Sequence, residues 1–140
     1  MESIIKPAPS ISMMLVEDEA ATLELLAIIL PKKYPGALLH TAGNGRTGLD
    51  VFKTHTPNIV ITDFNMPEMC GSHMVDKIRA IKPETKFIVI TGDTGQIALE
   101  DSANKGFKFD HFIAKPVVFQ ALFTAIDQCL AEIGQQTNSE

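Results

Sequence analysis

Short apolar runs alternate with stretches of helical spacing along most of the chain. Runs of four to six mostly apolar residues are typical of strands that are covered on both faces. Between them, apolar residues recur every three or four positions, which is typical of helices that pack through one face. The pattern predicts strands at residues 11–16, 37–41, 59–62, 86–90 and 109–114.

Turn-forming and capping residues set the bounds of the predicted helices. Pro31 should end the first helix, because proline removes a helical N–H and crowds the preceding turn. Asn44 should cap the second, since its side chain can accept a backbone N–H at a helix N-terminus. Gly106 should close the fourth. The predicted helices cover residues 20–30, 45–54, 71–81, 96–105 and 117–133.

This alternation of strands and helices predicts an α/β protein with a parallel sheet and helices on both faces. Right-handed crossovers leave few topologies. The expected fold is a flavodoxin-like (βα)5 doubly wound sandwich with strand order 2-1-3-4-5. The length of 140 residues suits one domain. We expect a flexible lead at residues 1–10, the domain at 11–133 and a flexible tail at 134–140.

Composition narrows the classes of function. The net charge is -5 and no dense basic patch is present, which argues against a nucleic-acid-binding surface. No apolar run is long enough to span a bilayer, and the N-terminus lacks the features of a signal peptide. Cys70 and Cys129 are far apart and without metal-ligand spacing, as for reduced thiols. We therefore expect a cytoplasmic protein that contacts neither nucleic acid nor membrane.

Polar side chains stand at the ends of four predicted strands. Glu17 and Asp18 end the first strand, Asp63 the third, Thr91 the fourth and Lys115 the fifth. All carboxyl ends of a parallel sheet lie along one edge, and ligands bind there beside the point where strand order reverses. The sequence thus predicts that three carboxylates, a hydroxyl and an ammonium converge on one pocket.

Each of these groups has a chemical use. Three adjacent carboxylates repel one another, and an incomplete set of oxygen ligands suits Mg²⁺ (or Mn²⁺) better than zinc. Asp63 is then the expected nucleophile for a phosphoryl group, with Lys115 and Thr91 contacting its oxygens. Taken singly, each signal has a plainer interpretation: Asp18 could cap the following helix, and a lone Asp often forms a turn.

Four motifs carry a resemblance to a known family. They are LVEDE (Leu15 to Glu19), ITDFNMPEMCG (Ile61 to Gly71), VITG (Val89 to Gly92) and IAKP (Ile113 to Pro116). With these motifs the sequence resembles the response-regulator receiver family from Ile11 to about Ile133. The resemblance implies a two-component signalling protein, a phosphoprotein that is modified on an aspartate.

The resemblance also implies roles for single residues. Glu17, Asp18, Asp63 and the backbone carbonyl of Asn65 would surround the metal. Asp63 would attack the phosphohistidine of a histidine kinase or a phosphotransfer protein. Such a protein catalyses only its own phosphorylation and dephosphorylation, so it is not an enzyme in the usual sense, and no organic cofactor is expected.

A second set of implied roles concerns the response to phosphorylation. Thr91 and Lys115 would hold the phosphoryl oxygens, Thr91 would move inward, and Phe112 would rotate into the space left behind. The Lys115–Pro116 peptide bond is expected to be cis. Asn65 and Asp93 border the phosphoryl group and would tune its lifetime.

The sequence departs from the family at two places. Phe112 lacks the hydroxyl of a tyrosine at the switch position, so a hydrogen bond made there is absent. The segment from Gly106 to Lys115 is about two residues longer than usual and is rich in phenylalanine. Two of its three aromatic residues, Phe107, Phe109 and Phe112, are expected in the core.

Alternatives remain beside the phosphoacceptor switch. The output of the switch would be contact with an unknown downstream protein, and a phosphorylation-dependent homodimer is a further expectation near the last strand. The runner-up is a receiver-like docking module that is not phosphorylated. A flavin-binding electron carrier would need a phosphate loop after the first strand, where Glu17, Asp18 and Glu19 would repel it. A phosphate-ester hydrolase would need a second acid/base beside Asp63.

Overall fold

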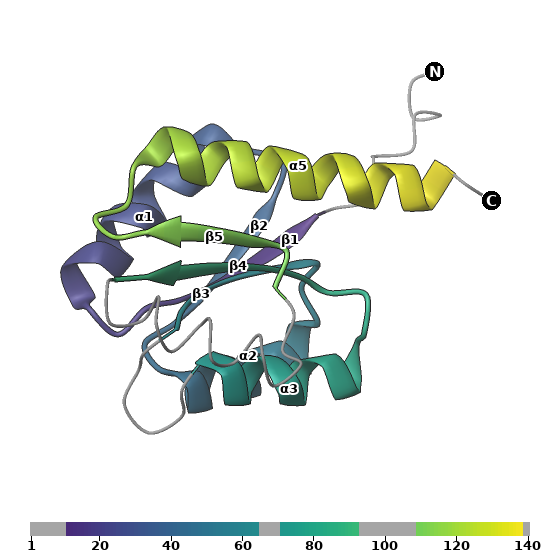
Figure 1. Ribbon diagram of the computed structural model, residues 1–140, viewed down its shortest axis with the longest axis horizontal. Coiled ribbons are helices and arrows are strands. Elements are labelled where there is room, and N and C mark those ends of the chain that lie inside the picture. Colours follow the sequence, from purple (N-terminus) through teal and green to yellow (C-terminus); the bar gives the residue numbers. More distant parts are fainter. Residues whose placement is uncertain (1–10, 65–70, 93–108, 139–140) are drawn as a thin grey trace, which may run out of the picture.

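The fold is a five-stranded parallel sheet covered on both faces by helices, in a computed structural model that describes residues 11–64, 71–92 and 109–138 (Figure 1). The strand order is β2-β1-β3-β4-β5, which confirms the predicted flavodoxin-like topology. The elements are β1 (Ser12–Val16), α1 (Ala20–Lys33), β2 (Leu38–Ala42), α2 (Gly45–His55), β3 (Ile59–Asp63), α3 (Gly71–Ile81), β4 (Lys86–Thr91), β5 (His111–Ala114) and α5 (Phe119–Asn138).

Alternation along the buried strands divides the core into two layers. On β1, Met13 and Leu15 face α1 and α5, whereas Met14 and Val16 face α2 and α3. Figure 1 shows these helix pairs on opposite sides of the sheet. Because β1, β3 and β4 are covered on both faces, most of their side chains are apolar, and the polar ones lie at or near the strand ends. Burial of these two layers is the main stabilising contribution to the fold.

One side-chain hydrogen bond caps a helix and another joins two helices. The Asn44 side chain accepts the backbone N–H of Thr47 at 2.8 Å, which confirms the predicted cap of α2. On the other face, the Tyr34 hydroxyl after α1 donates to Asp127 Oδ1 of α5 at 2.9 Å and lies 3.2 Å from the carbonyl of Phe123. This contact joins α1 to α5 across the surface of the layer.

The prediction that Pro31 ends the first helix is wrong. Pro31 lies inside α1, which continues to Lys33. The proline removes one hydrogen-bond donor near the last turn, but Leu30 is fully buried and its carbonyl accepts the N–H of Tyr34 at 2.8 Å. Packing and this terminal hydrogen bond therefore stabilise the last turn of α1, which the sequence alone did not predict.

The last strand and helix also differ from their predicted bounds. β5 begins at His111, not at Phe109. Just before it, the Asp110 N–H donates to the carbonyl of Phe87 at 3.1 Å, and the Asp110 side chain accepts the N–H of Phe87 at 2.7 Å. α5 begins at Phe119 and runs to Asn138. Residues 134–138, which we expected to be part of a flexible tail, are therefore helical.

Other expectations lie outside the described residues. These are the lead at residues 1–10, the helix at 96–105 with its closing Gly106, and the final residues 139–140. Within the described ranges, none of the helices combines the length and the apolar content that crossing a bilayer would require.

Candidate functional site

Parallel pairing brings the predicted polar residues to one edge of the sheet. Val16 pairs with Thr62, so the acidic pair after β1 lies beside Asp63 at the end of β3. Asp63 pairs with Ile90, and Thr91 pairs with Ala114. The ends of β1, β3, β4 and β5 are thereby adjacent, which is the arrangement that the order 2-1-3-4-5 required.

Three carboxylates and one ammonium meet at this edge. One carboxylate oxygen from each of Glu17, Asp18 and Asp63 lies within 4.8 Å of the others. Lys115 Nζ donates to Asp63 Oδ2 at 2.6 Å and lies 3.8 Å from Glu17 Oε2. Four of the five polar side chains that were predicted to converge at the strand ends therefore form one charged cluster.

Glu17 is the most deeply placed member of the cluster. Its side chain is fully buried, Oε2 accepts the backbone N–H of Glu19 at 3.0 Å, and Oε1 is buried without a hydrogen-bond partner among the described residues. Burial raises the pKa of Glu17 to about 7; the Glu19 bond opposes this shift and the charge of Asp63 adds to it. A buried carboxylate oxygen without a partner is costly unless a cation or proton satisfies it.

The cluster fits a magnesium ion on its own chemistry. Its donors are all carboxylate oxygens, two of the three acids are buried, and Asp18 is exposed toward solvent. Mg²⁺ is typically held by one or two carboxylates while it keeps several waters. The unpartnered Oε1 of Glu17 is the atom whose environment such an ion would complete. Helix capping does not explain the acidic pair, because the N-cap of α1 is Glu19, whose side chain makes no capping bond.

Lys115 is held at the site by its backbone as well as its side chain. Its N–H donates to the carbonyl of Thr91 at 2.9 Å, and the Lys115–Pro116 bond is cis, as predicted. Partial burial lowers the pKa of Lys115, but the hydrogen bond to Asp63 and the charges of Asp63, Glu17 and Asp18 outweigh it and raise the pKa. The ammonium thus stays charged beside the carboxylate of Asp63.

The two predicted switch residues are in different environments. Thr91 is buried, and its hydroxyl donates to the carbonyl of the adjacent Gly92 at 3.1 Å. Phe112 is 52% exposed. Of the three aromatic residues near β5, Phe109 is partly buried against the core, Phe112 is not buried, and Phe107 lies outside the described residues.

A chain of aromatic rings connects the acidic edge to Phe112, and the sequence did not reveal it. The ring of Phe64, next to Asp63, meets Phe109 edge to face at 6.0 Å, and Phe109 meets Phe112 in the same way at 5.9 Å. Such pairs favour defined mutual orientations. The run of phenylalanines was visible in the sequence, but which of them contact Phe64 depends on the path of the chain.

Two predicted site residues lie outside the described part of the chain. They are Asn65, expected to offer a metal ligand and to tune the lifetime, and Asp93, expected to tune the lifetime.

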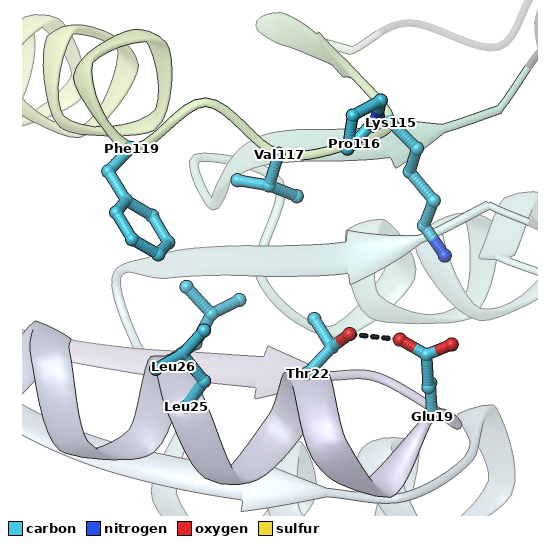
Figure 2. A pocket seen from close by; sticks show the side chains of 8 residues that line it. All are labelled: Glu19, Thr22, Leu25, Leu26, Lys115, Pro116, Val117 and Phe119. Carbon is cyan, nitrogen blue, oxygen red and sulfur yellow. Dashed lines mark hydrogen bonds between the residues drawn. The ribbon is translucent and has the colours of Figure 1, made fainter.

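A cavity of about 230 Å³ adjoins the charged cluster. Figure 2 shows α1 on one side of it and the segment that leads from β5 into α5 on the other, with the Lys115 side chain at one end. Thr22 donates a hydrogen bond to Glu19 at the same end. The cavity is lined by Glu19, Thr22, Leu25, Leu26, Lys115, Pro116, Val117 and Phe119.

Comparison with a family profile and with known sequences points to one family. The sequence profile of the response regulator receiver domain matches residues 13–127. The "Uncharacterized transcriptional regulatory protein YesN" of Bacillus subtilis is 32% identical over 124 residues, which are 88% of this chain and 33% of that protein. The "Transcriptional regulatory protein GlrR" of Escherichia coli is 32% identical over 133 residues, 95% of this chain and 28% of that protein. The chain thus spans about a third of the length of these relatives.

Solved structures agree with the sequence comparison. A two component transcriptional regulator AraC from Clostridium phytofermentans ISDg has a TM-score of 0.81 at 26% identity, with 92% of this chain and 99% of that chain covered. A CheY-like response regulator receiver domain protein from Methanospirillum hungatei has a TM-score of 0.77 at 25% identity, with 91% and 99% covered.

Proposed function

The chain belongs to the response regulator receiver domain family of two-component systems, and on that premise we propose that Asp63 accepts a phosphoryl group from a histidine kinase or a phosphotransfer protein. The observation that carries the proposal is the 2.6 Å contact between Lys115 Nζ and Asp63 Oδ2 within the cluster of three carboxylates. A nucleophilic carboxylate, a fixed cation and a set of oxygen ligands are the parts that phosphoryl transfer to a carboxylate needs.

The transfer would proceed by direct displacement. An oxygen of the Asp63 carboxylate forms a bond to the phosphorus of the donor's phosphohistidine as the phosphorus–nitrogen bond breaks. The electron pair of that bond stays on the imidazole nitrogen, which takes up a proton. Lys115, already beside Asp63, would hold one phosphoryl oxygen, and the Thr91 hydroxyl would exchange its bond to the Gly92 carbonyl for another.

Glu17, Asp18, Asp63 and the backbone carbonyl of Asn65 would hold Mg²⁺ (or Mn²⁺) at this edge. The ion would offset the negative charge of the phosphoryl oxygens. The residues of the chain would set its position: Glu17 is fixed by burial and by the N–H of Glu19, while Asp18 is exposed to solvent.

The donor would approach over the cavity beside Lys115. The cavity adjoins the cluster, and Leu25, Val117 and Phe119 give it an apolar lining with partly exposed side chains. Leu25→Asp should slow phosphoryl transfer from a protein donor and leave transfer from a small phosphodonor unchanged. Ile81→Asp, a matched change of an exposed apolar residue on α3 at the other face of the sheet, should affect neither rate. Equal rates for wild type and Leu25→Asp with the protein donor would exclude this route.

Switching would pass from Thr91 and the aromatic chain to the surface of β5. Phe112 is exposed and contacts Phe109, which contacts Phe64 beside Asp63. Inward rotation of Phe112 on phosphorylation would change the surface offered to a downstream protein or to a second copy of the chain. NMR spectra of the Phe112 ring before and after phosphorylation test this, and an unchanged ring environment would argue against it.

The lifetime of the phosphoryl group would depend on Asn65 and Asp93. An acidic Asp93 should alter the rate of dephosphorylation relative to a neutral residue. Dephosphorylation rates of wild type and Asp93→Ala check this, and identical rates would remove Asp93 from the proposal.

The deciding experiment is intact mass after incubation with a small phosphodonor and Mg²⁺. Wild type should gain one phosphoryl group in a metal-dependent way, and Asp63→Ala should gain none. Asp76→Ala, which removes an exposed carboxylate on α3, is the matched control and should behave as wild type. A folded wild type without any gain would favour the alternative, a receiver-like module that acts by docking alone.

A further inference from the structure

A second group of metal-ligating side chains lies at the opposite end of β5 from Lys115. His111 is the first residue of β5, and Cys129 and Glu132 lie one turn apart on α5. One ligand atom from each lies within 4.8 Å of the others. Figure 1 shows why they meet: α5 runs back over β5, so its later turns lie above the start of the strand.

Two of the three ligand atoms, the sulfur of Cys129 and Nε2 of His111, are shielded from solvent. The Cys129 side chain is fully inaccessible to solvent. His111 Nε2 is also buried and has no hydrogen-bond partner in the part of the chain that the structure describes. A buried imidazole nitrogen without a partner costs free energy, and in native proteins such an atom calls for an explanation.

We propose that His111, Cys129 and Glu132 bind one divalent transition-metal ion, of which zinc is the best match. An imidazole nitrogen, a thiolate and a carboxylate are all zinc ligands, and three protein ligands with a water in the fourth position make a tetrahedral site. The sulfur ligand distinguishes the metal preference of this site from that of the carboxylate cluster at the other end of the sheet, because Mg²⁺ prefers oxygen ligands alone. Zinc would give Nε2 of His111 the partner that it lacks.

Charges around the group favour a cation. Lys86 Nζ lies 3.3 Å from Glu132 Oε1 and 4.0 Å from Asp110 Oδ1. Lys86, Glu132, Asp110 and a neutral Cys129 thiol together carry one net negative charge. A dication that binds the thiolate brings the cluster to neutrality, with Lys86 left to pair with Asp110.

Binding must displace the thiol proton. Burial, with the charges of Asp110 and Glu132, raises the pKa of Cys129 to about 12, so the free protein holds a thiol. When the sulfur–metal bond forms, the sulfur–hydrogen bond breaks and the proton goes to solvent, since a metal ion deprotonates a thiol that coordinates it. Affinity should therefore fall as the pH is lowered.

The three ligand atoms must move slightly closer together to bind zinc. Ligand atoms of a tetrahedral zinc site lie about 3.5 Å apart, whereas the three atoms here are bounded by 4.8 Å. Glu132 is exposed and has a long side chain, so a rotation on the surface of α5 can bring its carboxylate in. His111 and Cys129 are anchored on packed elements and would set the position of the ion.

Titration of the purified protein with Co²⁺ tests the site, because a cobalt–thiolate bond has its own charge-transfer absorption. Wild type should develop this absorption up to one equivalent and lose it when Zn²⁺ is added. Cys129→Ser and His111→Gln should lack it. Cys70→Ser, the matched change of the other cysteine in the chain, should retain it.

The outcomes are independent of the proposed phosphoryl transfer. Cobalt bound by Glu17, Asp18 and Asp63 would give no thiolate absorption, and Asp63→Ala should leave the thiolate signal intact. Absence of the absorption in wild type, or its persistence in Cys129→Ser, would overturn the proposal. If circular dichroism shows that Cys129→Ser does not fold, His111→Gln decides, since unchanged cobalt absorption in that variant would equally exclude the site.

Discussion

At the residue scale, Glu17 carries an electrostatic cost that the rest of the sheet edge does not relieve. It is fully buried, Asp63 lies close by, and one of its oxygens has no hydrogen-bond partner among the described residues. Lys115 is nearer to Asp63, at 2.6 Å, than to Glu17, at 3.8 Å. The free protein therefore holds a carboxyl whose ionised form is disfavoured, as expected where a cation is to bind.

Replacement of Glu17 by Gln should stabilise the metal-free protein. The pKa of Glu17 is raised from 4.5 to about 7 by burial, opposed by the Glu19 hydrogen bond. Its contribution to stability is then present below about pH 4.5 and is lost as the pH rises through about 7, because the folded state holds the proton more tightly than the unfolded state. Glu17→Gln should raise the free energy of unfolding at pH 8 by about 1–3 kcal/mol.

Urea unfolding with a chelator present, at pH values from 5 to 8, measures this effect. The difference between Glu17→Gln and wild type should grow with pH. Asp76→Ala, which removes one exposed carboxylate elsewhere, should show no such growth. A difference that is constant with pH would mean that Glu17 does not titrate in this window.

The residues of the site were predictable to the extent that strand ends fix them. Asp63 and Lys115 were expected at one edge from the order of the elements, and the structure brings them into contact. The sequence could not tell which of Glu17 and Asp18 is buried, because that depends on the direction of the chain as it leaves β1. Nor could it pair Phe64 with Phe109, because these two residues are far apart in the sequence.

At the scale of elements, the packing of α2 against β1 leaves no room for a side chain at Gly48. A Cβ at this position would lie 3.0 Å from Val16 Cγ2, 3.4 Å from Val16 Cγ1 and 3.1 Å from Met74 Sδ. Met74 could move its flexible end, but both methyl groups of Val16 face the glycine, so rotation of that side chain gives no room. The approach of α2 to the sheet thus depends on one position.

Gly48→Ala should destabilise the protein by about 1 kcal/mol. The crowding costs about 1–3 kcal/mol, and the better helix propensity of alanine returns up to about 1 kcal/mol. Thermal or urea unfolding measures the net effect. Gly48→Ala should destabilise the protein less in a Val16→Ala background than in the wild-type background, because the Val16 methyl groups are then absent. A stabilised Gly48→Ala protein would mean that α2 can shift outward without cost.

On the opposite face, Tyr34→Phe should weaken the link between α1 and α5. The variant keeps the ring, which packs edge to face on Phe123, and removes only the hydroxyl that donates to Asp127. We expect a loss of about 1 kcal/mol in the free energy of unfolding, because the partner is an exposed carboxylate. Tyr34→Phe should cost less in an Asp127→Ala background, where the carbonyl of Phe123 at 3.2 Å is the acceptor that remains, and an equal cost in both backgrounds would contradict the link.

Element bounds show where pattern reasoning fails. α3 and the cap of α2 were predicted correctly because their signals are local: Met74, Val75 and Ile78 recur at helical spacing, and Asn44 precedes the helix. Pro31 misled because a local rule was overridden by the burial of Leu30. β5 begins later than predicted, and the hydrogen bonds between Asp110 and Phe87 just before it join residues that are distant in sequence, which no local pattern contains.

At the scale of the whole molecule, Mg²⁺ should stabilise the fold. A ligand at a hundred times its dissociation constant adds about 2.7 kcal/mol to the free energy of unfolding if it binds only the folded state. The melting temperature of wild type should therefore rise with Mg²⁺ concentration. In Asp18→Asn, which removes an exposed acid of the cluster, the rise should be smaller at the same concentrations. Equal rises in both proteins would indicate binding elsewhere.

Because the site is built from four strand ends, its residues emerge from the ribosome at different times during translation. The cluster draws its acidic pair from positions 17–18, the proposed acceptor from position 63 and the lysine from position 115. The segments before position 115 therefore lack the ammonium that pairs with Asp63. A nascent chain on the ribosome would therefore present the proposed acceptor, Asp63, before Lys115 has emerged, and the charged centre would form only after that. A donor present during translation would not phosphorylate chains that still lack Lys115.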